Sequence, residues 1–281
     1  MSEVEPGLVS PGLVSLVGAG PGDPELLTIK ALRALQRADV VLHDFLVSDE
    51  VLDLARREAR RIVVGKRGHG PSCPQSEINR LIVSLARKGH RVVRLKGGDP
   101  LFFGRAAEEI AACREAGIAV EIIPGITAAQ GAAASLGVPL TDRDGSPRMQ
   151  FISGHGRNGD LPEDFDARIL ADRSVLTAIY MGRRTFARLR DMALAAGIDP
   201  QTPAMAVFSA TRPEQHSIGG TIADLPERIS SLPSAEPVIL LLGWALRHAV
   251  HAGACPGEVR PREACPGEAG ENLPANRRRV A

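Results

Sequence analysis

Five glycine-rich or charged segments of this 281-residue chain could together bind a small polar ligand. Each follows a short apolar run and precedes a stretch with helical spacing. In chain order they are Gly18-Ala19-Gly20-Pro21-Gly22-Asp23, His43-Asp44, Gly65-Lys66-Arg67-Gly68, Gly97-Gly98-Asp99-Pro100 and Pro124-Gly125-Ile126-Thr127. Glycine permits close backbone approach, and free amides at helix starts bind negative groups. Ligands of open α/β sheets bind at the carboxyl ends of the strands, so we expect the five segments to converge on one site.

The first segment partly matches a dinucleotide-binding fingerprint. Gly18 and Gly20 give the initial G-x-G, and Asp44 closes the next expected strand at about the right distance. The fingerprint then fails, because Asp23 stands where Gly or Ala is needed and Pro21 removes an amide donor. A nucleoside ligand without phosphates suits this loop better. A dinucleotide site and a tight turn with no ligand are the alternatives.

The hydrophobic pattern predicts the elements that must position these segments. Strands are expected at 14–17, 39–42, 61–64, 92–95 and 120–123. Helices are expected from Pro24 onward with Asp23 as cap, and at 49–59, 75–87, 101–116 and 127–136. Alternating strands and helices predict a mostly parallel sheet.

The second half has a different pattern after the polar turn 141–147. Strands are expected at 148–153, 175–181, 204–209, 214–222 and 237–243, and helices at 183–196 and 223–231. This favours an α+β unit with mixed or antiparallel pairing. The expected organisation is a leader at 1–13, an N-terminal α/β domain at 14–143, a C-terminal α/β domain at 144–251 and a disordered tail at 252–281.

Composition excludes several classes of protein. Lys and Arg number 34 against 33 Asp and Glu, and aromatic residues are only 3%, so we expect no nucleic-acid partner. The longest apolar run, around 238–242, is too short to span a membrane. Four Cys without metal-like pairing and no secretory leader predict a cytoplasmic protein. A metal site at Cys255 and Cys265 in the tail is the less favoured interpretation.

Six motifs together resemble the uroporphyrinogen-III C-methyltransferase branch of the tetrapyrrole methylase family. They are VGAGPGDPELLT, HDFLVSDEV, GKRGHGPSCPQSEIN, VVRLKGGDPLFFGR, PGITAAQGAAASLGVPLTDRD and YMG, in order over roughly residues 14–250. The resemblance implies a two-domain tetrapyrrole methylase fold with a cleft, S-adenosylmethionine as methyl donor, no metal and a homodimer. It also implies methylation of uroporphyrinogen III at C2 and C7, giving precorrin-2 through precorrin-1 for sirohaem or cobalamin biosynthesis.

The resemblance assigns two catalytic residues. Asp44 matches the family's proton acceptor, although a helix cap or loop acid is the alternative interpretation. Lys66 matches a proposed proton donor. Lys66 and its neighbour Arg67 could equally pair with substrate carboxylates, because the pKa of lysine lies far from neutrality unless it is shifted.

The resemblance also assigns binding residues. Those matched to the methyl donor are Pro21, Gly97, Gly98, Asp99, Phe102, Thr127, Ala128, Met181 and Ala210. Those expected to bind substrate are Arg67, Arg105, Arg143 and His155, with Arg148, Arg183 and Arg184 as further candidates for its eight carboxylates. Asp99 could instead cap a helix, Met181 could be core, an arginine could simply be solvated and His155 could hold a loop.

Three alanines depart from the family pattern. Ala106 and Ala107 replace a glycine pair and would add methyl groups near the cleft, and Ala210 replaces a glycine whose backbone contacts the donor. If position 210 needs a positive φ, alanine there costs about 1 kcal/mol or more. We expect activity to be retained. The alternatives are a methylase acting at another ring position and, from a different class, a dinucleotide-binding oxidoreductase or a non-catalytic binding module.

Overall fold

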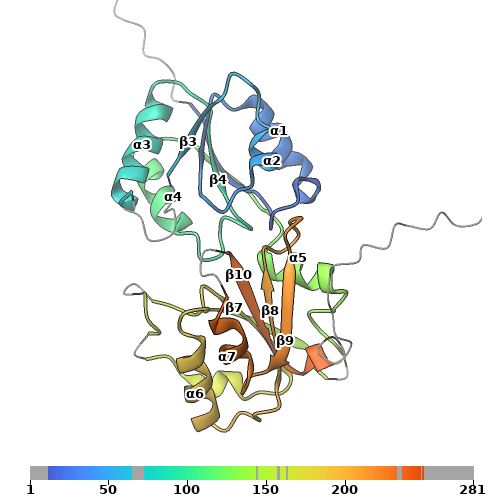
Figure 1. Ribbon diagram of the computed structural model, residues 1–281. Helices are drawn as coiled ribbons and strands as arrows, with labels where there is room; N and C mark the ends of the chain where they lie inside the picture. Colours follow the sequence, from blue (N-terminus) through green and yellow to red (C-terminus); the bar gives the residue numbers. More distant parts are fainter. Residues whose placement is uncertain are drawn as a thin grey trace, which may run out of the picture.

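The chain folds around two five-stranded sheets, one in each half of the molecule (Figure 1). This computed structural model describes residues 12–64, 73–143, 145–156, 159–162, 164–232, 236–247 and 249. The expected tail, nearly all of the leader, and the predicted site residues Lys66 and Arg67 lie outside the described residues. Within those residues, no helix is long and apolar enough to cross a membrane.

The first sheet is entirely parallel, as the sequence predicts. Its strands are β1 (Val14–Gly18), β2 (Val40–His43), β3 (Arg60–Val63), β4 (Val92–Lys96) and β5 (Val120–Ile123). They lie in the order β3-β2-β4-β1-β5. The chain therefore returns to the middle of the sheet at β4, which places the carboxyl ends of β2, β4 and β1 side by side. Segments far apart in sequence meet at this edge.

Helices cover both faces of the first sheet. They are α1 (Ile29–Arg37) and α2 (Asp49–Leu52) on one face, and α3 (Gln75–Arg87) and α4 (Ala106–Glu115) on the other. Strand residues alternate between the two cores: Val93 packs toward α1, and Val92 packs toward α3 and α4. Because side chains of a strand point alternately to opposite faces, Arg94 and Lys96 share the face of Val92.

Three predicted helices begin later or end sooner than expected. Asp23 caps only the 3₁₀ turn Pro24–Leu26, and Thr28 caps α1 by accepting a hydrogen bond from the Ala31 amide. The helix expected at 49–59 ends at Leu52. The helix expected at 101–116 begins only at 106, because Phe103 and Arg105 have φ angles of 52° and 55°, which a right-handed helix does not accept.

The second sheet is mixed. Its strands are β6 (Arg148–Ser153), β7 (Val175–Tyr180), β8 (Pro203–Phe208), β9 (His216–Thr221) and β10 (Val238–Leu242), in the order β6-β7-β10-β8-β9. β6 pairs with β7 in parallel, and the other pairs are antiparallel. Short 3₁₀ turns lie at Ala167–Leu170 and Trp244–Leu246. The fold class expected from the sequence is confirmed.

One helix of the first half packs on the second sheet. α6 (Phe186–Ala195) and α7 (Leu225–Ser230) cover one face of that sheet, and α5 (Ala128–Leu136) covers the other (Figure 1). Ala129 and Ala132 of α5 are fully buried in one core with Leu176, Val207 and Leu241. The domain limit near 143 stays a prediction, but the core of the second sheet already includes α5.

Candidate functional site

A cavity of about 760 Å³ lies between the two halves. From the first half it is lined by the segments that follow β1, β2, β4 and β5, and from the second half by the ends of β7, β8 and β10. Four of the five segments singled out in the sequence converge here. The fifth, 65–68, lies outside the described residues.

Three glycines, Gly18, Gly98 and Gly125, pack against one another where β1, β4 and β5 end, and Gly98 also lines the cavity. A Cβ atom on Gly18 would lie 2.6 Å from the carbonyl oxygen of Gly98 and from Cα of Gly125. A Cβ on Gly125 would lie 2.3 Å from the same oxygen. Gly20 and Gly98, both with positive φ, form an antiparallel bridge that ties the first and fourth segments together. Side chains at these positions would push the loops apart, so glycine is required by packing here.

Asp99 clamps two of the converging loops. Its Oδ1 accepts a hydrogen bond from the Leu101 amide at 2.8 Å, and its Oδ2 accepts one from the Gly125 amide at 3.0 Å. The carboxylate therefore orders the turn after β4 and joins it to the turn after β5. The alternative interpretation of Asp99 as a helix cap does not apply, because α4 begins only at residue 106. Asp99 instead caps the turn after β4.

The start of α5 forms another wall of the cavity. Thr127 and Gln130 make a capping box that satisfies amides of the first turn, and the Ala129 amide donates to the Tyr180 hydroxyl at 3.2 Å. Burial raises the pKa of Tyr180 above its usual value. One turn further, a Cβ on Gly131 would lie 2.6 Å from Cγ of Pro21. Close packing of α5 thus fixes the loop after β1.

The backbone after β7 and β8 has its own strained positions. Met181 has a φ of 56°, and its half-exposed side chain lines the cavity rather than the core. After β8 the positive φ angles fall on Ser209 (48°) and Thr211 (66°). Ala210 between them is buried and does not take a positive φ, so the expected strain cost of alanine there does not arise.

Unlike Ala210, which lines the cavity, the other two departures lie away from it. Ala106 is buried against α3, and Ala107 is exposed on the first turn of α4. Neither residue lines the cavity, so their methyl groups do not narrow it. The reason is the loop 101–105, which carries the chain out of the cavity before α4 begins.

The structure brings together all nine residues matched to the methyl donor. Pro21, Gly97, Gly98, Asp99, Phe102, Thr127, Ala128, Met181 and Ala210 line the one cavity, and Asp44 lines it as well. Their assigned roles stay predictions.

The residues expected to bind substrate are more dispersed. Arg183 and Arg184 line the cavity, but Arg105, Arg143 and His155 are not among its lining residues. Arg105 pairs with Glu108 at 2.7 Å on the first turn of α4. His155 Nδ1 lies 3.3 Å from the Met181 carbonyl oxygen, which fits a role in holding the loop after β7. Arg148 pairs with Asp172 on the edge of the second sheet.

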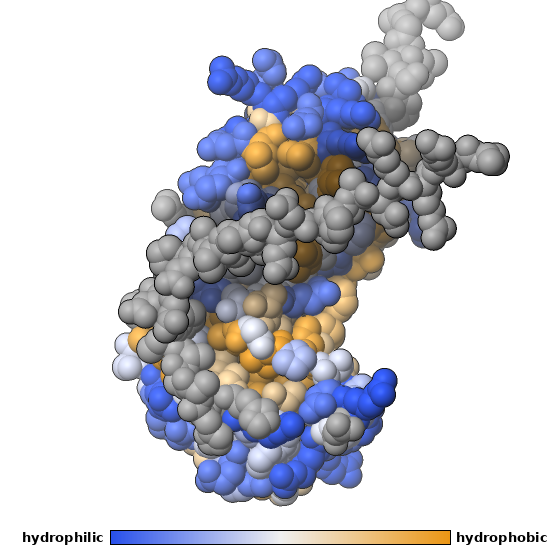
Figure 2. Space-filling model, turned by 90° about the vertical axis from the view of Figure 1, so that its right-hand side faces the viewer, coloured by the Kyte–Doolittle hydropathy of each residue, from blue (hydrophilic) through white to orange (hydrophobic). Residues whose placement is uncertain are grey.

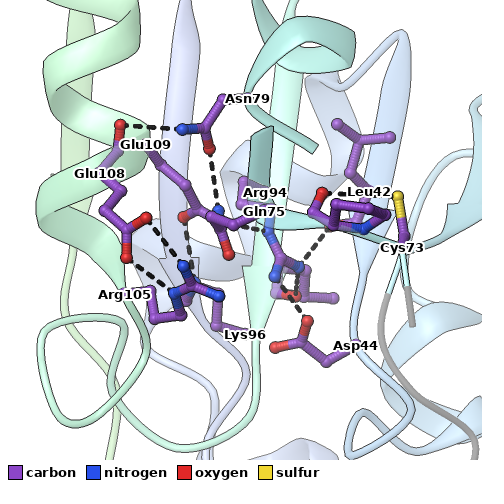
Figure 3. A network of polar contacts seen from close by, with 12 residues as sticks. Leu42, Asp44, Cys73, Gln75, Asn79, Arg94, Lys96, Arg105, Glu108 and Glu109 are labelled. Atoms are coloured by element: carbon purple, nitrogen blue, oxygen red, sulfur yellow. Dashed lines mark hydrogen bonds and ion pairs between the residues drawn. The ribbon is translucent and has the colours of Figure 1, made fainter. Parts of the chain in front are cut away.

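Figure 3 shows a cluster of charged side chains behind Asp44 that the sequence analysis did not identify. Arg94 Nη2 contacts Asp44 Oδ1 at 2.5 Å, and Arg94 Nε contacts Glu109 Oε1 at 2.9 Å. Lys96 Nζ pairs with Glu109 Oε2 at 3.0 Å. The sequence of β4 could have indicated this cluster. A buried parallel strand normally has a continuous apolar sequence, whereas β4 reads V-V-R-L-K and so buries two cations.

Burial and neighbouring charges move the pKa values of the two cations in opposite directions. Burial acts to lower the pKa of Arg94, but the carboxylates of Asp44 and Glu109 outweigh it and raise that pKa. Burial and the adjacent Arg94 lower the pKa of Lys96 from its usual value. The Lys96 stem fits only because Gly104 has no side chain: a Cβ there would lie 2.7 Å from Lys96 Cε.

Aromatic side chains join the two halves next to the cavity. Phe102 and Phe103, from the loop after β4, lie with ring centroids 5.1 Å from Phe151 and Tyr180 of the second sheet. Phe102 and Phe103 remain about two-fifths exposed. The face shown in Figure 2 carries apolar patches on both halves between polar ends. The site therefore combines apolar surface with a few directed charges, as small-molecule sites do.

Comparison with known proteins gives matches over most of the chain. The family model for tetrapyrrole (corrin/porphyrin) methylases matches residues 13–226. A siroheme synthase of Chromobacterium violaceum is 48% identical over 232 residues, which are 83% of this chain and 49% of that protein. The chain thus spans about half the length of the curated relatives it matches.

Solved structures agree with the sequence matches. Uroporphyrin-III C-methyltransferase from Thermus thermophilus, solved with S-adenosylhomocysteine, has a TM-score of 0.72 and 37% identity, and the match covers 84% of this chain and 100% of that one. A cobalt precorrin-4 methyltransferase has a TM-score of 0.74 and 29% identity, covering 83% and 95%. With this fold, these matches and four of the five motif segments gathered at one cavity, the chain belongs to the tetrapyrrole methylases.

Proposed function

We propose that this protein methylates uroporphyrinogen III at C2 and C7, with S-adenosylmethionine as donor, and so forms precorrin-2. The observation that carries the proposal is the shared cavity: Asp44 and all nine residues matched to the donor line it. The relatives agree, since a uroporphyrin-III C-methyltransferase that is 37% identical to this chain binds S-adenosylhomocysteine in its crystal structure. The product would serve the pathway to sirohaem or cobalamin.

The cavity fits a donor that combines a nucleoside with an amino acid. The turn of Gly97 and Gly98 offers backbone without side-chain obstruction, and Ala128 and Ala210 leave room beside it. Phe102 and Met181 supply apolar contacts. When bound, S-adenosylmethionine would supply an electrophilic methyl group. The electron-rich pyrrole carbon needs no activation by a covalent nucleophile, so the protein has to align it and remove a proton.

We assign the removal of that proton to Asp44, which lines the cavity. Its Oδ1 is held by Arg94, and no described residue donates a hydrogen bond to its Oδ2. The methylated ring carbon already carries a side chain and has no hydrogen, so the proton is lost from a pyrrole nitrogen or a bridging carbon of the tetrapyrrole, and Oδ2 can accept it. The lining cations Arg183, Arg184 and Arg212 suit the carboxylates of the substrate. Lys66 and Arg67 are proposed for the same purpose from the sequence. A homodimer is also proposed, on the family resemblance alone.

The proposal is tested by anaerobic incubation of the protein with uroporphyrinogen III and S-adenosylmethionine, with mass spectrometry of the tetrapyrrole. We expect a gain of two methyl groups for the native protein. The Asp44→Asn variant should lose most of this activity and still bind S-adenosylhomocysteine by calorimetry. Asp53→Asn is the matched control, because Asp53 is an exposed acid of the same half that pairs only with Arg61 among described residues.

Three results would contradict parts of the proposal. Equal methylation by Asp44→Asn would remove Asp44 from the reaction. Donor binding without methyl transfer would redirect the search to another tetrapyrrole substrate. Absence of binding of S-adenosylhomocysteine would reject the methyltransferase function for this chain.

A further inference from the structure

Glu109 is fully buried behind the cavity, and the reaction proposed above gives it no role. It lies on the first turns of α4 and faces β4, where Arg94 and Lys96 occupy alternate positions (Figure 3). The Glu109 side chain is 0% exposed, and those of Arg94 and Lys96 are each 4% exposed. Asp44 and Lys96 both line the cavity, and of the four residues in this cluster only Asp44 has an appreciable exposure, 24%.

The contacts of Glu109 use both of its carboxylate oxygens. Oε1 accepts from Arg94 Nε at 2.9 Å and from Gln75 Nε2 at 3.3 Å. Oε2 accepts from Lys96 Nζ at 3.0 Å. Gln75 is itself anchored by Asn79, since its Nε2 also donates to Asn79 Oδ1 at 2.8 Å. Glu109 is thus held by two elements, α3 and β4, in addition to its own helix.

The guanidinium group of Arg94 is oriented by contacts at all three of its nitrogens. Its Nε contacts Glu109, its Nη1 donates to the Leu95 carbonyl oxygen at 3.2 Å, and its Nη2 contacts Asp44 Oδ1 at 2.5 Å. A guanidinium group is planar, so two fixed nitrogens determine where the third one points. Glu109 fixes Nε of the guanidinium group, so the direction in which Nη2 points and the orientation of the Asp44 carboxylate follow.

Stability alone does not account for this cluster. Burying ions is costly, and replacing a buried charged cluster with apolar side chains of similar volume is often neutral or stabilising. The neighbouring positions of the same core are apolar, among them Val92 and Ile82. A requirement for one defined geometry at Asp44 explains why charged groups occupy these positions.

We propose that Glu109 is a positioning residue of the candidate site: its buried carboxylate orients Arg94, and Arg94 presents Asp44 to the cavity. The role of Asp44 in this inference rests on the proposed function. The orientation of Asp44 by Glu109 is a structural statement that can be tested without activity.

The first test is a crystal structure of the Glu109→Met variant. Methionine has a similar shape and accepts no hydrogen bond from Arg94. The single change leaves one buried cation without a matching carboxylate. The double variant Glu109→Met/Lys96→Met is therefore made as well, because in it the charges of Arg94 and Asp44 balance. We expect Arg94 to lose its single orientation and its contact with Asp44 Oδ1 to lengthen or to split between conformers. Arg94 and Asp44 in their original positions, in either variant, would overturn the inference.

The second test is a kinetic double-mutant cycle with Asp44→Asn. Glu109→Met should lower kcat by about 10- to 100-fold, the size expected for misplacing a catalytic group, and leave KM for S-adenosylmethionine within about twofold. In the Asp44→Asn background the same change should cost almost nothing, because Glu109 acts through Asp44. An equal loss in both backgrounds would refute this.

Two companion variants separate positioning from general stability. Glu109→Gln keeps an oxygen that can accept from Arg94, so it should retain most of kcat. Glu115→Met changes an exposed glutamate of the same helix and should leave kcat unchanged. If the unmodified protein makes no methylated product, the proposed function fails, and the crystal structures alone then decide whether Glu109 orients Asp44.

Discussion

Gly125 lies where the ends of β1, β4 and β5 meet, and Gly125→Ala tests how tightly these three loops pack beside the cavity. A Cβ there would be 2.3 Å from the carbonyl oxygen of Gly98 and 2.8 Å from Cα of Gly18. Cβ atoms essentially never approach other atoms within 3.0 Å, so the backbone would have to move by about 0.7 Å. The neighbours are backbone atoms, which cannot rotate away as a flexible side chain does.

The expected cost follows from this displacement. Overpacking of a rigid core costs about 1–3 kcal/mol. Removing glycine from the unfolded chain returns about 0.4–1 kcal/mol. We therefore expect the free energy of unfolding to fall by about 1–2 kcal/mol. The Gly125 amide also holds Asp99 Oδ2, so the turn after β4 should shift and affinity for S-adenosylhomocysteine should fall by about tenfold, or 1.4 kcal/mol.

Urea unfolding followed by circular dichroism measures the first quantity, and titration calorimetry measures the second. Gly156→Ala is the matched control, because the nearest atom to a Cβ there is 3.6 Å away and its φ is not positive. That variant should be as stable as the native protein or slightly more so, with unchanged affinity. If Gly125→Ala matched Gly156→Ala in both measurements, the close approach of the three loops would not exist in solution.

Three further predictions concern other parts of the fold. Burial alone would raise the pKa of Asp39, but hydrogen bonds from the Arg91 amide and guanidinium group lower it below 3.8. Asp39→Asn should therefore cost about 1–2 kcal/mol of unfolding free energy at neutral pH, and urea titrations should show this difference vanishing as the pH falls through the folded-state pKa. Gly131→Ala favours an isolated helix by about 1 kcal/mol, yet it should lower the melting temperature, because its Cβ would meet Pro21 at 2.6 Å; a higher melting temperature would contradict that contact. Burial raises the pKa of Cys113 to about 11, so mass spectrometry should find this thiol unmodified by iodoacetamide at pH 8 until urea unfolds the protein.

The sequence by itself determined the local structure of the site. The strand at 120–123 and the helix at 75–87 have the predicted limits, because strand length, apolar period and turn residues are local properties. The convergence of the glycine segments was predictable for a general reason, since parallel strands bring their carboxyl ends to one edge. The motif match then identified the family over most of the chain.

Helix limits within charged or loop-forming stretches could not be predicted in this way. Nothing in residues 101–105 alone predicts the positive φ of Phe103, whose ring centroid lies 5.1 Å from that of Tyr180 in the second sheet. The residues with positive φ after β8 could not be predicted from the sequence either. The sequence analysis considered a positive φ at Ala210, whereas the structure has positive φ angles at Ser209 and Thr211.

Only the tertiary structure determined which residues act together across the fold. Arg94, Lys96 and Glu109 are separated by no more than 15 positions, but nothing in their spacing shows that Glu109 of α4 meets both cations of β4 or that Arg94 links it to Asp44. Likewise, the sequence of α5 does not show that this helix packs against the second sheet, which only the tertiary structure shows. The local sequence determines each helix or strand through its own hydrogen bonds and hydrophobic periodicity. The partners of a buried charge instead depend on the one packing arrangement that buries the apolar faces of all helices and strands together.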